Sequence, residues 1–146
     1  MKLNELLMCQ GVKRWHIVDT SRTQSVAEHS FNVAVIACKF MEKRGCAFEE
    51  IAPAVCLALM HDADEIYEGD IPAIAKKKPV LKENLAERAI QIADKLEAYW
   101  FAHHYAIGPR RRFVVEDTRL RFSTLVGKCD PLDRTAWLEI QRNMET

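Results

Sequence analysis

Residues 79–105 have the sequence PVLKENLAERAIQIADKLEAYWFAHHY, and this stretch decides the fold. Apolar residues recur in it at every third or fourth position, which is the period of one face of an α-helix. The members of this apolar stripe are Leu81, Leu85, Ala89, Ile92, Leu96 and Tyr99. Gly108 and Pro109 follow it, and both residue types end helices. We therefore predict a long helix from Pro79 to about Tyr105 with one face in a core.

Further helices are predicted on both sides of this stretch. Gly11 and Gly45 end the first two, because glycine readily adopts the backbone conformation that terminates a helix. SVAE at residues 25–28 fits a capping box, in which a hydroxyl and a carboxylate satisfy free amides at a helix start. Pro53 fits the first turn of the third helix, where no amide hydrogen is needed. The predicted spans are 3–10, 25–44, 49–62 and, as one or two helices broken near Asp130 and Pro131, 115–144.

The chain as a whole has the pattern of an all-α protein. No run alternates between apolar and polar residues as a strand does, and no internal repeat appears. A length of 146 residues is typical of one domain. We predict a single-domain helical bundle over residues 1–146.

The composition of the chain limits the classes of molecule that it is expected to bind. The 21 basic and 21 acidic residues cancel, so nothing favours binding to a nucleic-acid polymer or an anionic membrane. No stretch approaches the roughly 20 apolar residues of a membrane span. The five cysteines are odd in number and form no CxxC pair, which is typical of reduced thiols. We expect a soluble cytoplasmic protein that forms a homo-oligomer, a dimer or larger, and binds a small molecule.

Titratable residues interrupt the apolar pattern at LMHDADEIYEGDIP, residues 59–72. Burying such groups is costly unless something pairs with them, so a metal, a substrate or water must be near. His61 continues the apolar stripe of its helix, and His29 lies on the stripe of the preceding one. With Asp62 and the distant Asp130 they form a mixed nitrogen and oxygen donor set, which suits zinc, cobalt, manganese or iron. Taken singly, each histidine could be a core residue, and Asp130 could be the N-cap of a helix that begins at Pro131.

The joint pattern resembles the HD-domain metal-dependent phosphohydrolases. Within them it resembles the 5′-deoxynucleotidase group and its shorter phage relatives that degrade deoxynucleoside triphosphates. The resemblance rests on Arg14-Trp15, VAEHS at 26–30, HDADEIYEGDIP at 61–72 and GKCD ending at Asp130. It implies an HD-type bundle in which one divalent ion (Co, Zn, Mn or Mg) is bound, with a second ion accompanying the substrate as an open alternative. The implied ligands are His29, His61, Asp62 and Asp130.

Two further carboxylates acquire catalytic roles under this resemblance. Glu65 follows His61 by four residues, so it could accept a proton from the metal-bound water and return it to the leaving 5′-oxygen. A solvated carboxylate at a helix end is the alternative for Glu65. Asp70 occupies a position that the family uses at the site, and it is the second candidate for proton transfer or for orienting the water.

Substrate selection is expected in the loop before the VAEHS helix. The guanidinium of Arg14 suits phosphate, and the ring of Trp15 offers a face for the base or the deoxyribose. Ile17 could form an apolar wall for the base. Lys76, in the run KKK at 76–78, could hold the outer phosphates.

The sequence therefore predicts a hydrolase that cleaves the 5′ phosphoester of 2′-deoxynucleotides. We expect it to convert dNTPs, with dATP favoured by analogy with the phage relatives, to deoxynucleoside and triphosphate, and to accept dNMPs. A plain 5′-deoxynucleotidase acting on dNMPs is the first alternative. An HD enzyme for cyclic nucleotides or alarmones is the second, although the Arg-Trp pair disfavours it. A non-catalytic, metal-bound nucleotide-binding module is the third, and the spare carboxylates disfavour it because a structural site does not need them.

Overall fold

The computed structural model describes residues 2–69 and 80–145. Helices are the regular elements in this part of the chain, which confirms the all-α prediction. They are α1 (Leu3–Leu7), the 3₁₀ helix η1 (Met8–Gly11), α2 (Val26–Lys43), α3 (Phe48–Met60), α4 (Glu65–Glu68), α5 (Leu85–Tyr105), α6 (Arg111–Gly127) and α7 (Pro131–Glu145).

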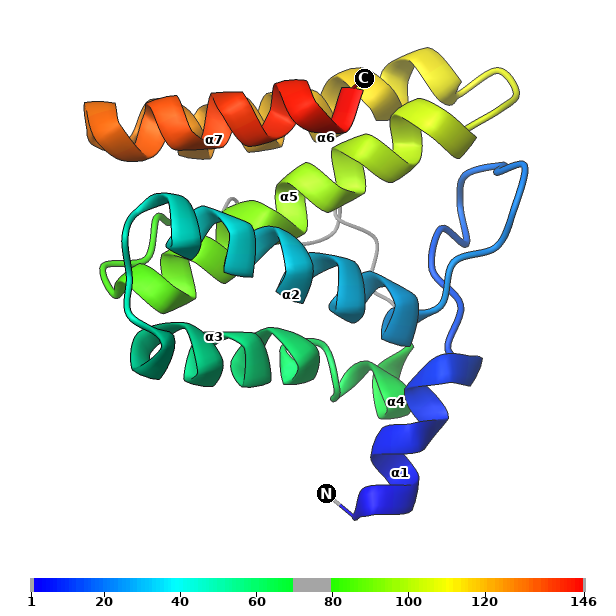
Figure 1. Ribbon diagram of the computed structural model, residues 1–146. Coiled ribbons are helices and arrows are strands. Elements are labelled where there is room, and N and C mark those ends of the chain that lie inside the picture. The colour runs from blue at the N-terminus through cyan, green and yellow to red at the C-terminus, as the bar shows by residue number, and fades with distance from the viewer. Residues whose placement is uncertain (1, 70–79, 146) are drawn as a thin grey trace.

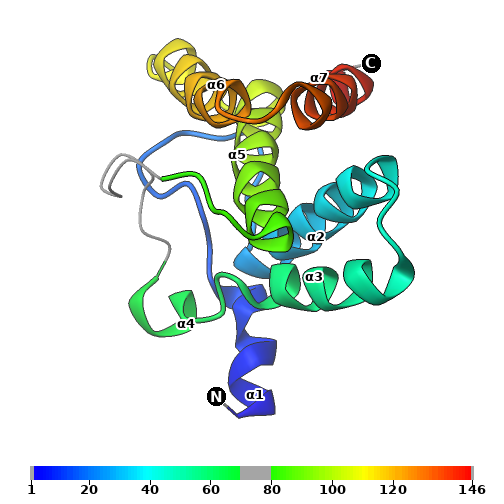
Figure 2. The same cartoon turned by 90° about the vertical axis from the view of Figure 1, so that its left-hand side faces the viewer.

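Helix α5 is the centre of the bundle. It contacts α2, α3, α6 and α7, and α2 packs in turn against α3 and α7. Figure 2 shows α6 and α7 on one side of α5, with α2 and α3 on the other. The 3₁₀ helix η1 contacts α2, and α1 extends from it away from the bundle, so that N and C lie at opposite ends of the molecule in Figure 1. Because α5 is surrounded, the polar side chains that it carries inward require partners.

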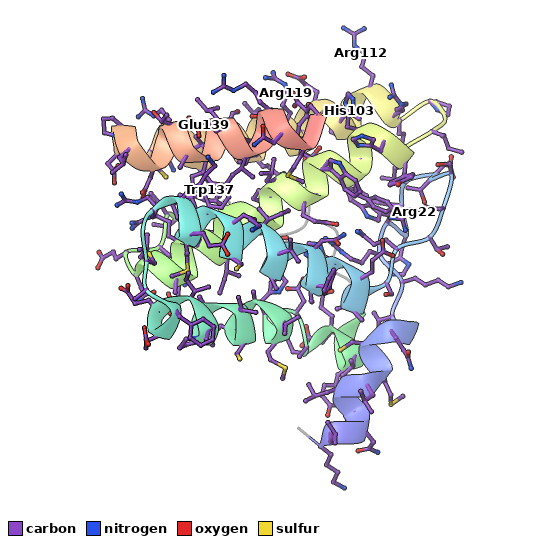
Figure 3. All side chains as sticks on the ribbon, in the orientation of Figure 1. Arg22, His103, Arg112, Arg119, Trp137 and Glu139 are labelled. Carbon is purple, nitrogen blue, oxygen red and sulfur yellow. The ribbon has the colours of Figure 1, made fainter. Side chains whose placement is uncertain are left out.

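An aromatic pair joins α2 to α7 in the core. The rings of Phe40 and Trp137 stack with centroids 4.2 Å apart and planes 8° from parallel. Both side chains are fully buried, and Figure 3 shows Trp137 on the side of α7 that faces α2. Truncating a buried Trp to alanine typically costs about 3–5 kcal/mol, so this contact is a major part of the packing of α7.

The start of α2 differs in one respect from the predicted capping box. The Ser25 hydroxyl accepts a hydrogen bond from the amide of Glu28 at 3.1 Å, as predicted. The Glu28 carboxylate instead accepts two hydrogen bonds from the guanidinium of Arg22, at 2.6 and 3.1 Å. Gly45 has φ of +76°, which confirms it as the residue after the helix end that needs a left-handed backbone.

One predicted helix start and the predicted position of one proline are corrected. Helix α5 begins at Leu85 rather than Pro79, because the side chain of Asn84 accepts a hydrogen bond from the amide of Glu87 and caps the helix there. Helix α3 begins at Phe48, which places Pro53 inside the helix rather than in its first turn.

The last third of the chain forms two helices, the second of the two alternatives that the sequence left open. Helix α6 begins at Arg111, four residues before the predicted start, and α7 begins at Pro131. The five cysteines are free thiols. In residues 2–69 and 80–145, no helix is long and apolar enough to span a membrane.

Candidate metal centre

His29 lies in α2, and one of its two ring nitrogens is hydrogen-bonded within the protein. Its side chain is fully buried, and its Nδ1 lies 2.5 Å from Oε2 of Glu97 on α5. An ionised carboxylate can only accept a hydrogen bond, so the proton of the imidazole is on Nδ1. The lone pair of Nε2 is then available to bind a metal.

His61 is arranged in the same way at the end of α3. Its Nδ1 lies 2.7 Å from the carbonyl oxygen of Ala58, and because a carbonyl only accepts, Nδ1 again carries the proton. The rings of His29 and His61 have centroids 5.3 Å apart. Both Nε2 atoms are buried, and neither has a hydrogen-bond partner among the described residues. Two buried lone pairs directed to one place are what a metal site requires.

Two carboxylates lie beside these nitrogens. Asp62 Oδ2 is 3.5 Å from Nε2 of His29 and 3.2 Å from Nε2 of His61. Asp94 Oδ1, from α5, is 3.2 Å from Nε2 of His29, and single ligand atoms of His29, His61 and Asp94 all lie within 4.8 Å of one another. Ligands of a tetrahedral zinc ion at about 2.0–2.1 Å are roughly 3.3–3.4 Å apart, which is close to the three pair distances of 3.2–3.5 Å. The group whose ligand atoms all lie within 4.8 Å of one another is His29, His61 and Asp94, and Asp62 adjoins it through the two histidines.

The charges of the site favour a bound cation. Burial raises the pKa of Asp62, but the neighbouring imidazoles of His61 and His29 together outweigh burial and the pKa is lowered. Burial likewise opposes ionisation of Asp94, but the Lys95 ammonium and His29 hold its pKa well below its usual range. Burial lowers the pKa of His29, yet Glu97 and Asp94 outweigh it and the pKa is raised. Both aspartates are therefore ionised at neutral pH, and metal binding must displace any proton on Nε2 of His29.

The prediction for Asp130 is corrected. This exposed residue precedes α7, and its Oδ1 accepts hydrogen bonds from the amides of Leu132 (3.0 Å) and Asp133 (2.9 Å). It is therefore the N-cap that the sequence left as the alternative. Asp94, which the apolar stripe of its helix does not contain, lies beside His29 and His61 instead. The signal was present, since Asp94 and Glu97 are charged residues one turn apart in the central helix.

The candidate proton-transfer residue Glu65 comes three residues after Asp62 in the sequence. It is the first residue of α4, its side chain is buried, and its amide donates a hydrogen bond to the carbonyl of Asp62 at 3.1 Å. This burial excludes the alternative of a solvated helix-end carboxylate. Asp70 and Lys76 lie outside the described residues.

The predicted substrate residues lie in the loop between η1 and α2. Trp15 has φ of +67°, a conformation that costs a bulky residue about 1–3 kcal/mol and is often found at functional sites. One face of its ring stacks on Phe101, with centroids 5.5 Å apart and planes 14° from parallel. The guanidinium of Arg14 also lies over this ring, 5.8 Å from its centroid. Arg14 Nη1 lies 3.5 Å from Oε2 of Glu97, and Ile17 is half exposed.

The loop is anchored to the end of α5. Arg22 places its guanidinium over the rings of Phe101 and Tyr105, 4.9 and 4.3 Å from their centroids. Figure 3 shows Arg22 where the loop passes this end of α5. Cation–π contacts of this kind contribute about 0.5–2 kcal/mol each, so they help to hold the loop beside the site.

Comparison with known proteins gives one consistent group. The model of the family described as "5′-deoxynucleotidase YfbR-like" matches residues 3–98. A dATP triphosphohydrolase of Salmonella phage PMBT28 is 32% identical over 131 residues, which cover 71% of this chain and 68% of that protein. A 5′-deoxynucleotidase of Shewanella oneidensis is 36% identical over 69 residues, 44% of this chain and 35% of that one.

A solved structure shares the fold. It is the HD phosphohydrolase DatZ of cyanophage S-2L, bound to dA and one catalytic Zn²⁺ ion. The TM-score is 0.80 with 22% sequence identity, and the match covers 99% of this chain and 97% of that one. The helices described above therefore have the arrangement of an HD phosphohydrolase.

Proposed function

The chain belongs to the YfbR-like 5′-deoxynucleotidase family, and from this premise we propose that it is a divalent-metal-dependent hydrolase of 2′-deoxynucleotides. The reaction breaks the bond between phosphorus and the 5′-oxygen, with water supplying the new oxygen on phosphorus. The observation that carries the proposal is the convergence of the two buried Nε2 atoms with the carboxylates of Asp62 and Asp94.

His29, His61, Asp62 and Asp94 would hold the ion. A divalent ion bound there polarises a phosphoryl oxygen and lowers the pKa of a bound water toward neutrality. His29 is fully buried, but the side chains of His61, Asp62 and Asp94 retain 16–20% exposure. The donor set is therefore accessible from one side, where water and a phosphate can approach.

We assign proton transfer to Glu65. It follows Asp62 by three residues, and its burial keeps the carboxylate out of bulk water. It would accept the proton of the attacking water and then donate it to the 5′-oxygen as the deoxynucleoside departs. Asp70 remains the second candidate for this transfer.

The substrate proposed is a dNTP, with dATP favoured and deoxynucleoside and triphosphate as products. The support is the name of the Salmonella phage relative and the dA bound to DatZ. Arg14 would contact phosphate, the ring of Trp15 would contact the base or sugar, and Ile17 would form an apolar wall. Lys76 would hold the outer phosphates.

A plain 5′-deoxynucleotidase is the second candidate, and the family description and the Shewanella relative favour it. Incubating the protein with each dNMP and dNTP, in the presence of Co²⁺, Mn²⁺, Zn²⁺ or Mg²⁺, separates the two. Triphosphate release from dATP supports the first, and orthophosphate release from dNMPs alone supports the second. Nucleotide binding without hydrolysis under every metal would leave a non-catalytic module.

The same experiments address the remaining expectations. The metal that gives the highest turnover identifies the preferred ion, and the dependence of the rate on metal concentration tests for a second ion bound with substrate. A homo-oligomer, for which light scattering on the purified protein is the test, and a cytoplasmic location stay predictions.

A further inference from the structure

Glu97 is a buried carboxylate whose two oxygens serve different parts of the site. It is fully buried in α5. Oε2 accepts from Nδ1 of His29 at 2.5 Å and lies 3.5 Å from Nη1 of Arg14. Oε1 accepts from Nε2 of Gln24 at 2.6 Å and from Nδ2 of Asn32 at 3.0 Å. A buried charge persists only when it is paired and hydrogen-bonded, and these four contacts meet that requirement.

Gln24 extends the network into the substrate loop. It is 1% exposed, and its Oε1 accepts from Nε1 of Trp15 at 2.9 Å and from Nη1 of Arg14 at 3.4 Å. Its backbone carbonyl accepts from the amide of Arg14 at 2.9 Å. The side chains of Trp15 and Arg14 both donate hydrogen bonds to Gln24, and Gln24 donates to Glu97. The substrate loop and His29 are therefore connected to the same carboxylate.

We propose that Glu97 is a positioning residue shared by the metal centre and the substrate loop. Through Oε2 it fixes the proton of His29 on Nδ1 and makes Nε2 a more basic ligand. Through Oε1 and Gln24 it holds the indole of Trp15 and the guanidinium of Arg14 at the edge of the site. The part that concerns the loop rests on the proposed function, whereas the part that concerns His29 requires only that the site binds a metal.

The physical basis for the first part is the effect of hydrogen bonds on metal ligands. A carboxylate that accepts the second N–H of a ligating imidazole fixes its orientation, and losing such a partner typically weakens metal binding about 10–100-fold. In Glu97→Gln an amide replaces the carboxylate. Its NH₂ group must then face either His29 Nδ1–H or the donors of Gln24 and Asn32, so donor meets donor in both orientations.

The test compares Glu97→Gln with Gln24→Ala, which breaks the loop side of the network and leaves the contact with His29. Zn²⁺ affinity is measured on the metal-free proteins by competition with a chelator, and circular dichroism checks folding. We expect Glu97→Gln to bind Zn²⁺ about 10–100-fold more weakly than wild type. Gln24→Ala should bind Zn²⁺ as wild type does, with a raised KM for the nucleotide in both variants.

Nitrogen-15 NMR of the histidine side chains in the Zn²⁺-loaded wild-type protein tests the same point without a substitution. We expect His29 to be bound through Nε2 with a proton on Nδ1. Coordination through Nδ1, or equal Zn²⁺ affinities for folded Glu97→Gln and wild type, would overturn the proposal. A wild-type protein that binds Zn²⁺ but hydrolyses no deoxynucleotide would instead contradict the proposed function, and the affinities would still decide the role of Glu97 toward His29.

Discussion

Replacing Asp94 by alanine should abolish most of the stabilisation that zinc gives to the protein, whereas replacing Asp130 by alanine should leave it intact. Asp94 Oδ1 lies 3.2 Å from Nε2 of His29, the nitrogen that we expect to bind the metal. Asp130 accepts backbone hydrogen bonds at the start of α7. The two variants therefore separate a metal ligand from a helix cap.

The size of the effect follows from mass action. Zinc at 100 times its dissociation constant stabilises the native state by about 2.7 kcal/mol. For a domain of this length, each kcal/mol raises Tm by about 2–4 °C, so wild type should gain roughly 5–11 °C. Loss of a ligand should weaken binding at least as much as loss of an outer partner, about 100-fold. At the same zinc concentration Asp94→Ala would then gain only about 0.4 kcal/mol, or roughly 1–2 °C.

The assay is thermal unfolding of protein stripped with a chelator and then titrated with Zn²⁺. Asp130→Ala should unfold about 2–4 °C below wild type at every zinc concentration, because it loses a cap, but its zinc-induced gain should match that of wild type. Asp130→Ser, which restores a capping oxygen, serves as the matched control. A full zinc-induced gain in Asp94→Ala, or its loss in Asp130→Ala, would refute this ligand set.

Three further outcomes are expected. Glu65→Ala should keep its metal and bind nucleotide but turn over about 10²–10⁴-fold more slowly, as measured by steady-state kinetics. Near-normal turnover would assign the proton transfer to Asp70 instead. Lys76→Ala should raise KM for dATP more than for dAMP, and an equal change for both would remove the support for a triphosphate subsite at this lysine. Trp15→Ala should raise KM for dATP while Zn²⁺ affinity is unchanged, and an unchanged KM would exclude the indole as a binding surface for the nucleotide.

Much of this site could be predicted because helical periodicity is a local property. The three- and four-residue spacing of apolar residues placed His29 inside the bundle, and it is fully buried. The break before Pro131 was also predictable from a local property, because proline has no amide hydrogen to donate and is well suited to the first position of a helix.

Asp94 could not be identified from a single stripe because α5 is buried on more than one side. The predicted stripe through Ile92 and Leu96 does not contain it. A second buried row, through Ile90, Ala93 and Phe101, also lines this helix and includes Glu97. In a helix that is apolar around most of its circumference, an acidic residue next to such a row needs a partner. Which partner it has depends on packing against α2, which periodicity does not encode.

The most direct test of the central claim is product analysis on wild-type protein that has been freed of metal and then reloaded. With dATP, the metal-free protein should be inactive, and addition of a divalent ion should release deoxyadenosine and intact triphosphate in equal amounts. His61→Ala, which lacks one of the two buried Nε2 ligands, should remain inactive under the same conditions. Release of pyrophosphate with dAMP, or equal activity of wild type and His61→Ala, would contradict hydrolysis of the 5′ phosphoester at this metal centre.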